Sequence, residues 1–261
     1  LLGNMLVPAP ANIAAGQADV VGVAIGNAGS LTGTIVLGLT SKAAAAGLTD
    51  LALASKSVAV TGAAYDYATA NLSTTSLTLG NIRVAGTAAV GVTNTVVTNA
   101  LYQDKLQVAA AGTNANLTVS SPALVAAGTT GQIGLAAAKA GTLADTVSVG
   151  LTSNANGVLG LTNVTLAGQS VAVTGAAYDY AKPTVASTLA LGNVRTNTAA
   201  TLGVANTVIT NALYQDSLAV AATTTLGNVL VASPANIAAG QSDVVGVAIG
   251  NAGSLTGTIV L

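Results

Sequence analysis

The chain of 261 residues contains no cysteine, histidine, glutamate, tryptophan or phenylalanine, and only 6% of it is charged. Without cysteine there is no disulfide framework and no thiolate-bound metal. Without histidine the usual general base and the commonest metal ligand are missing. Seven Lys and Arg, spread along the chain, argue against the clustered positive charge that nucleic-acid binding needs.

The eight acidic residues are all Asp, and each stands alone in the sequence. The closest two, Asp50 and Asp66, are 16 residues apart. Calcium binding and acid–base catalysis both need groups that converge, and calcium loops commonly bring their carboxylates at D-x-D spacing. The sequence therefore predicts no catalytic, cofactor-binding or metal-binding residue, and single solvated aspartates in loops.

Half of the chain is apolar, mostly Ala, Val and Leu, and the net charge is −1. Disorder needs low hydrophobicity and high net charge, and this chain has neither. Its apolar runs are short and broken by Thr, Asn and Gly, so no membrane-spanning helix is expected. A surface so poor in charge suits a protein that packs against copies of itself or lies outside the cell.

The chain is written in copies. Pro10, Pro122 and Pro234 follow one another at a step of 112 residues, and the phrase VAVTGAAYDYA occurs at 58–68 and again at 171–181. A double step of 224 fits better still, because residues 2–37 and 226–261 differ at only four of 36 positions. We therefore expect alternating units, and the 261 residues to be a window on a longer array.

Alternation of apolar with small or polar residues over 76–84, 89–97 and 105–111 predicts β-strands. Two further runs surround the glycine-rich cluster at 26–30, which predicts a hairpin loop. The Ala-rich stretch 41–57 has helix propensity, but its copy at 153–170 indicates loop and strand. Turn signals every 8–12 residues and a unit near about 100 residues favour an all-β sandwich. A β-solenoid is the alternative, although the unit contains no shorter repeat.

The motif Leu-Gly-Asn-Ile/Val-Arg at 79–83 and 191–195, and a closing L-x-x-Q-S-V-x-V-T-G-x-x-Y before the next unit, resemble choice-of-anchor D domain repeats. That resemblance implies tandem immunoglobulin-like sandwiches on a bacterial surface, although this chain has fewer aromatic residues than the family. In the family's phasing, residues 65–177 are one complete repeat. Residues 1–64 are then the C-terminal part of a repeat, and 178–261 a repeat lacking the strands that correspond to 38–64.

Two sets of residues repeat from unit to unit and are the candidates for structural roles. The repeating charges predict either a structural ion pair in each unit or independent solvated strand ends. The tyrosines near the unit boundary are predicted to be junction residues, with carbohydrate stacking as the alternative. The charges are Arg83, Asp66, Asp104, Arg195, Asp179 and Asp216, and the tyrosines are Tyr65, Tyr67, Tyr178 and Tyr180. The lysines do not repeat, so a Lys–Asn isopeptide bond in every unit is not predicted.

These observations argue against an enzyme and favour a structural role. The leading hypothesis is a segment of a secreted tandem-repeat array that forms a bacterial surface fibre, filament or extracellular matrix. Its partners would be copies of itself, head-to-tail or lateral. The alternative is a stalk or binding repeat of a glycan- or surface-binding adhesin.

Overall fold

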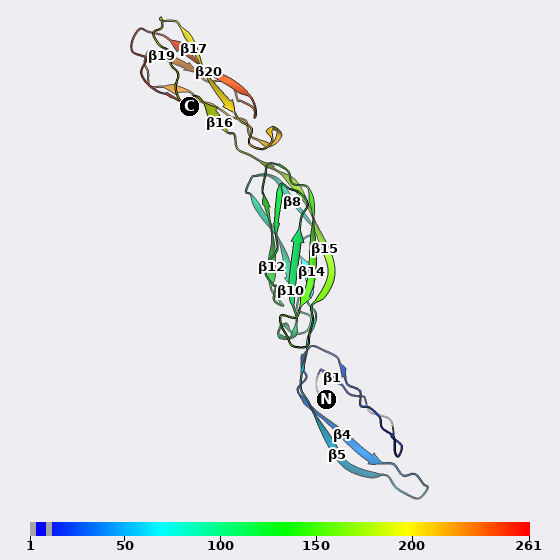
Figure 1. The fold of residues 1–261 in the computed structure, drawn as a ribbon. Coiled ribbons are helices and arrows are strands. Elements are labelled where there is room, and N and C mark those ends of the chain that lie inside the picture. The colour runs from blue at the N-terminus through cyan, green and yellow to red at the C-terminus, as the bar shows by residue number, and fades with distance from the viewer. Residues whose placement is uncertain (1–3, 9–11) are drawn as a thin grey trace.

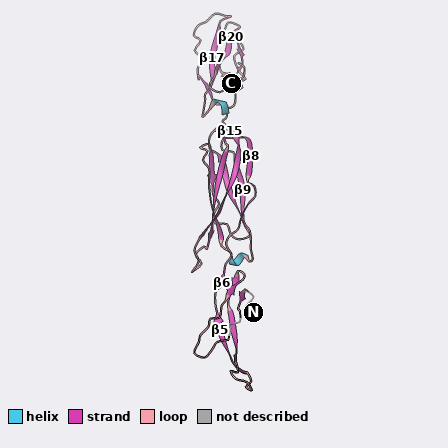
Figure 2. Cartoon of the chain, turned by 90° about the vertical axis from the view of Figure 1, so that its right-hand side faces the viewer, coloured by secondary structure: helices cyan, strands magenta, loops and turns pink. Residues whose placement is uncertain are grey.

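The computed structural model describes residues 4–8 and 12–261, which form strands and two single-turn 3-10 helices but no α-helix. Three parts follow one another along an elongated molecule, and each 3-10 turn lies near a boundary between parts (Figures 1 and 2). We call them the N-terminal part (to residue 64), the middle unit (65–177) and the C-terminal unit (178–261). The prediction of an all-β sandwich fold is confirmed, and the described residues form no closed solenoid.

The middle unit is a sandwich of two sheets. One sheet has the order β11-β12-β9-β7, formed by Leu117–Ser120, Thr130–Ala137, Thr87–Asn94 and Ala70–Leu72. The other has the order β10-β14-β15, formed by Lys105–Ala111, Asp145–Asn154 and Val164–Tyr178. Two more strands pair with β15, β13 (Gly141–Thr142) antiparallel and β8 (Ser76–Arg83) parallel.

The core of the middle unit consists of alternate side chains from the two inner faces. Because successive residues of a strand point to opposite sides, every second residue faces inward. Val90 and Val92 of β9 meet Val147 and Val149 of β14 in this core. With no large aromatic side chain in the cluster, β-branched and aliphatic residues fill the space between the sheets.

The C-terminal unit contains one complete sheet, with the order β16-β17-β20-β19, which is the order of β7-β9-β12-β11 one repeat later. Of the second sheet only a two-strand pairing is present, between β18 and β21. The strands are β16 (Pro183–Val185), β17 (Ala199–Asn206), β18 (Thr223–Thr224), β19 (Val229–Ala232), β20 (Ser242–Ile249) and β21 (Ile259–Val260).

The N-terminal part contains the complementary set of strands. Its main element is a hairpin of β4 and β5, and two short pairings, β1 with β2 and β3 with β6, stand beside it. The Ala-rich stretch 41–57 ends in β5 and forms no helix. The strands are β1 (Met5–Leu6), β2 (Ala24–Ile25), β3 (Gly29–Ser30), β4 (Gly33–Ser41), β5 (Leu51–Val60) and β6 (Ala63–Ala64).

The same sequence adopts different structures in the two end parts. Residues 242–249 form β20 between β17 and β19, whereas seven of the same eight residue types at 18–25 form only the two-residue β2. Val247 is 2% exposed, and its counterpart Val23 is 45% exposed. The strand forms where partner strands exist on both sides, because its backbone groups need them as hydrogen-bond partners.

The hairpin predicted around residues 26–30 is wrong. Strand β2, before this cluster, pairs with β1, and β4, after it, pairs with β5. In the middle unit the corresponding strands β12 and β14 lie in different sheets. The chain therefore crosses from one sheet to the other here, and Gly141 makes the crossing at a φ of 147°, where a Cβ atom would collide with the Asn116 side chain.

The repeat places a leucine at equivalent positions of two parts, buried in one and exposed in the other. Substituting each leucine therefore measures how much packing between two sheets contributes to stability. Leu151 is 3% exposed in the middle unit, while its counterpart Leu39 on the β4–β5 hairpin is 38% exposed. We expect Leu151→Ala to lower the free energy of unfolding of the middle unit by about 2–5 kcal/mol. In dilute solution Leu39→Ala should change stability far less. Urea unfolding followed by hydrogen exchange of each part checks this, and equal effects of the two substitutions would contradict it.

The Asp145 carboxylate holds the loop that follows β10. It accepts hydrogen bonds from Thr113 N (2.9 Å), Thr113 Oγ1 (2.9 Å), Asn114 N (3.1 Å) and Thr146 N (2.8 Å). Burial opposes the charged form and is the largest single influence, but these hydrogen bonds together lower the pKa of Asp145 below its usual value. The equivalent positions in the other parts are Gly33 and Gly257, so this contact belongs to the middle unit alone.

A lowered pKa in the folded state makes the stability of the middle unit depend on pH. The contribution of Asp145 is fully present above the unfolded pKa of about 4 and is lost as the pH falls through the folded pKa. Asp145→Asn should therefore be less stable than the wild type at pH 7, by about 1–2 kcal/mol for the lost charge-assisted hydrogen bonds. Urea midpoints from pH 7 to pH 2 should converge at the acid end. A constant difference across that range would exclude ionisation of Asp145 as the cause.

Candidate functional site at the unit junction

The last strand of the middle unit leads into the next unit without a linker. Strand β15 ends at Tyr178, and the next residue, Asp179, already forms a parallel bridge with Gln215 of the C-terminal unit. Asp179 N donates to Tyr214 O at 2.9 Å, and Asp216 N donates to Asp179 O at 3.1 Å. The chain is therefore fixed to the second unit within one residue of leaving the first.

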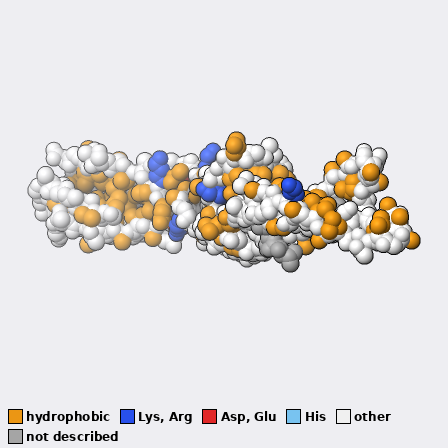
Figure 3. Space-filling model, turned by 90° about the horizontal axis from the view of Figure 1, so that it is seen from below, with side chains coloured by type: hydrophobic (Ala, Val, Ile, Leu, Met, Phe, Trp, Pro, Cys, Tyr) orange, Lys and Arg blue, Asp and Glu red, His pale blue; other side chains and the backbone are white. Residues whose placement is uncertain are grey.

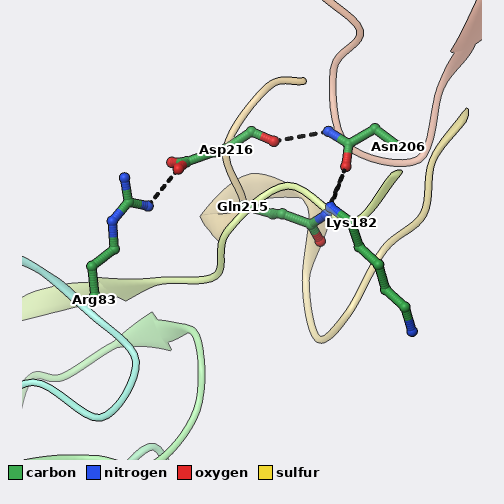
Figure 4. Close-up of polar contacts among 5 residues, drawn as sticks. All are labelled: Arg83, Lys182, Asn206, Gln215 and Asp216. Atoms are coloured by element: carbon green, nitrogen blue, oxygen red, sulfur yellow. Dashed lines mark hydrogen bonds and ion pairs between the residues drawn. The ribbon is translucent and has the colours of Figure 1, made fainter. Parts of the chain in front are cut away.

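An ion pair spans this junction. Arg83 is the last residue of β8 in the middle unit, and its Nη1 lies 2.6 Å from Asp216 Oδ2 of the C-terminal unit (Figure 4). The Arg83 guanidinium also lies 4.6 Å from the centre of the Tyr180 ring. The hydrogen bond with Asp216 raises the pKa of Arg83, so the charge persists at any physiological pH. Both partners are partly exposed, which makes the pair a positioning contact more than a source of stability.

The four tyrosines proposed for the junction divide into two types. Tyr65 packs against Tyr102 with ring centres 5.6 Å apart, and Tyr178 packs against Tyr214 at 5.5 Å in the same way. Tyr67 and Tyr180 are instead 61% and 66% exposed. The packed pair of tyrosines thus recurs at the start of both units, while the exposed ring of Tyr180 contacts the Arg83 guanidinium.

A buried amide network holds the loop that presents Asp216. Asn206 Nδ2 donates to Asp216 O (2.8 Å) and Ile237 O (3.1 Å), and Asn206 Oδ1 accepts from Lys182 N (3.0 Å). Gln215 Nε2 also donates to Asn206 Oδ1 at 3.0 Å (Figure 4). All the hydrogen-bonding atoms of the Asn206 side chain have partners, and such a network is rigid because breaking any one bond strands a buried polar group.

The middle unit contains the same network around Asn94. Asn94 Nδ2 donates to Asp104 O and Val125 O, and Asn94 Oδ1 accepts from Thr69 N and Gln103 Nε2, all between 2.9 and 3.2 Å. Neither asparagine is among the residues predicted from the sequence. The sequence did contain a signal for them. In each unit a polar residue ends an apolar strand and is followed nine residues later by a glutamine, and this combination recurs one repeat further on.

The remaining predicted charges have different surroundings. Asp66 accepts from Thr98 N at 3.1 Å, and Asp104 Oδ2 accepts from Ser153 Oγ at 2.7 Å. The buried atoms Asp104 Oδ1 and Asp179 Oδ2 have no hydrogen-bond partner within the described part of the chain, where Arg195 forms no ion pair. Among the described residues, these repeating charges form one ion pair, Arg83 with Asp216, and it joins neighbouring units instead of lying within one, because β8 ends at the boundary beside the next unit's Asp.

The junction also contains a small open hollow. It has a volume of about 280 Å³ and is lined by Asn81, Ile82, Arg83, Tyr178 and Asp216. Across residues 4–8 and 12–261, no three side chains of His, Cys, Asp or Glu gather into a possible metal site. In the same residues no helix is long and apolar enough to cross a membrane.

No family model matches this chain, and no curated protein matches it. Among solved structures, domains 1–6 of surface layer protein SbsC align at 16% identity with a TM-score of 0.28, over 79% of this chain and 27% of that one. Domains 4–9 of SbsC align at 16% identity with a TM-score of 0.27, over 88% and 32%. The chain spans about a third or less of either solved chain. The resemblance to choice-of-anchor D repeats stays a prediction.

If the ion pair positions the two units, its removal should widen their relative orientations while leaving each folded. The chain has no cysteine, so Thr118→Cys and Thr201→Cys, on exposed strand positions of the two units, give unique spin-label sites. Electron–electron distance distributions between these labels should broaden in Arg83→Ser. The exposed Lys139→Ser serves as the matched charge-removal control and should leave the distribution unchanged. An equally narrow distribution in Arg83→Ser would show that the backbone alone fixes the junction.

Proposed function

We propose that this chain is a structural segment of a secreted tandem-repeat array that forms a bacterial surface fibre, filament or extracellular matrix. The observation that carries the proposal is the direct passage of β15 from one unit into the next, with Arg83 and Asp216 across the boundary. We propose further that the units, bounded at 65–177 and 178–261, are immunoglobulin-like. In the middle unit, the strand orders β7-β9-β12-β11 and β10-β14-β15 match the ABED and CFG sheets of that fold, and in the C-terminal unit the order β16-β17-β20-β19 matches the first of these sheets.

The strand arrangement suits a protein under tension. Pulling on the array loads the middle unit at Tyr65 and Tyr178, which lie before β8 and at the end of β15. These two strands run parallel and are paired from Ser76–Ala172 to Arg83–Tyr178. Tension therefore slides one strand along the other and stretches all of their hydrogen bonds at once, instead of opening them one by one.

The surface suits association with further copies. Figure 3 shows isolated Lys and Arg side chains among hydrophobic and uncharged ones on the face it presents. A net charge of −1 in 261 residues gives little electrostatic repulsion between neighbouring molecules. Lateral and head-to-tail packing in the extracellular space are therefore part of the proposal.

The exposed tyrosines support a second candidate, the stalk or binding repeat of an adhesin. Tyr67 and Tyr180 stand at equivalent places in successive units and expose most of their rings. Exposed rings of this kind are used to stack on sugars. In this chain Arg83 already covers part of the Tyr180 ring, which favours the structural role.

Single-molecule stretching of the chain by its ends tests the structural proposal. We expect the middle unit to unfold in one step at a higher force than the C-terminal unit, which lacks a counterpart of β15 within the described residues. The extended length of residues 65–177 is roughly 370–410 Å, at about 3.3–3.6 Å for each residue, and the step should equal this length less the distance between the ends of the folded unit. Pulling between the N-terminal end of the chain and a cysteine at Thr118 in β11 leaves β15 unloaded. The force needed to unfold the middle unit should then be lower.

Two results would count against this function. If the middle unit extends at no higher force than the C-terminal unit, the tension-bearing role fails. If the chain binds a defined glycan on an array, and Tyr67→Ala or Tyr180→Ala abolishes that binding, the adhesin replaces it.

A further inference from the structure

Two contacts between tyrosine rings join the segment that enters a unit to the 3-10 turn of that unit. Tyr65 packs against Tyr102 with ring centres 5.6 Å apart and planes at 61°, and Tyr178 packs against Tyr214 at 5.5 Å and 55°. These separations lie in the range of direct aromatic contact. Because Tyr178 ends β15, the second contact joins the last strand of the middle unit to the C-terminal unit.

The backbone places both members of each pair. Asp66 N donates to Tyr102 O, and Asp179 N donates to Tyr214 O, at 2.9 Å in both units. The turn that presents the second tyrosine is capped in both units by the side chain of an asparagine, which accepts a backbone hydrogen bond at 3.0 Å. The two rings of a pair are therefore held as neighbours by the fold, which is the condition under which two groups react efficiently.

The composition leaves tyrosine as the main target of an oxidant. The chain has no cysteine and no tryptophan, and its one methionine, Met5, is only 4% exposed. Oxidation of sulfur side chains follows their exposure, so Met5 competes poorly. All four paired tyrosines are half-buried, and Tyr178 lines the open hollow at the junction, so a small oxidant reaches their rings.

We propose that Tyr65 with Tyr102, and Tyr178 with Tyr214, are sites of oxidative crosslinking at which each pair becomes a dityrosine. The oxidant is hydrogen peroxide acting through a peroxidase. One electron and one proton leave each phenol, and the two tyrosyl radicals form a carbon–carbon bond between their Cε atoms. The hydrogen on each of these carbons then shifts by tautomerisation to the oxygen of its own ring. The peroxide takes up the two electrons and two protons and is reduced to two molecules of water.

The crosslinks deepen the proposed function and rest on it, because that function places the chain outside the cell and under tension. Tension enters the middle unit at Tyr65, and a bond from Tyr65 to Tyr102 passes it directly to the 3-10 turn. The bond from Tyr178 to Tyr214 does the same where β15 enters the C-terminal unit. In a chain without cysteine, these bonds would take the role that disulfides have in many extracellular proteins.

Mass spectrometry of the 261-residue chain tests the proposal after treatment with hydrogen peroxide and a peroxidase at low protein concentration. We expect the monomer to lose the mass of two hydrogen atoms for each crosslink and to gain dityrosine fluorescence. Cleavage after Lys and Arg separates the members of each pair, since Lys182 precedes a proline and is not cut. Peptide 57–83 should be joined to 84–105, and peptide 140–195 to 196–261.

Each crosslink has its own substitution. Tyr102→Phe keeps the ring but removes the phenol, so the join between 57–83 and 84–105 should be lost while the other stays. Tyr214→Phe should give the reverse result. The matched control is Tyr67→Phe, which should keep both joins. Tyr67 lies in the same peptide as Tyr65 but is 61% exposed and contacts no other ring within the described residues. Circular dichroism checks that each variant is folded.

Stretching the oxidised chain gives a second readout. A bond from Tyr65 to Tyr102 keeps the residues between them out of the path of the force. The step for the middle unit should therefore shorten by up to roughly 120–130 Å, at about 3.3–3.6 Å for each residue of that segment. Tyr102→Phe should restore the full step after the same treatment.

Two outcomes would overturn the proposal. The first is an oxidised monomer whose mass is unchanged or has risen by oxygen atoms, with no joined peptides. The second is coupling through the exposed Tyr67 or Tyr180 that yields dimers in proportion to protein concentration, since the reaction would then occur between molecules. Neither outcome affects the stretching result for the untreated chain, so the proposed function stands or fails separately.

Discussion

The need of every β-strand for a partner governs this molecule. A strand leaves its backbone N–H and C=O groups unsatisfied unless a neighbour lies about 4.8 Å away, and burial without such a neighbour is costly. The chain contains a direct comparison, because 32 of 36 residues are the same in 2–37 and 226–261. Residues 242–249 are a strand and 18–25 mostly are not, while 33–41 are a strand and most of 257–261 are not. Local sequence therefore sets the capacity for a strand, and the neighbours decide whether it forms.

The second constraint is a core with no large aromatic side chain. Val, Leu, Ile and Ala fill the space between the sheets of the middle unit, and each buries less area than an aromatic residue would. At the end of the sandwich nearest the preceding unit, the amide network around Asn94 joins the first strand, the 3-10 turn and the loop at Val125. This network and its copy at Asn206 fix the loops on which Asp104 and Asp216 stand. Packing thus stabilises the body of the unit, and hydrogen bonds shape its ends.

The sequence was sufficient to predict strands and the all-β class, because the alternation of apolar with small or polar residues is a local signal. The sequence did not predict correctly which strands pair with each other. Glycine-rich residues 26–30 have the composition of a hairpin loop, yet the flanking strands belong to different pairs, since two sheets compete for them. The partner of Arg83 could not be predicted from the sequence either. Repetition identified both Arg83 and Asp216, but only the direction in which β8 runs places one against the other.

Some of the contacts at the unit boundaries recur from one unit to the next. At the start of both units the same backbone bonds recur, from Asp66 to Tyr102 at 2.9 Å and from Asp179 to Tyr214 at 2.9 Å. The last strand of the middle unit leads into the C-terminal unit with no intervening linker. A chain of such units behaves as a quasi-one-dimensional object whose stability comes from each unit and its contacts with neighbours. The paired strands β8 and β15 connect the stability of one unit to its contact with the next. Strand β15 pairs with β8 in the middle unit, and the chain enters the C-terminal unit directly after β15.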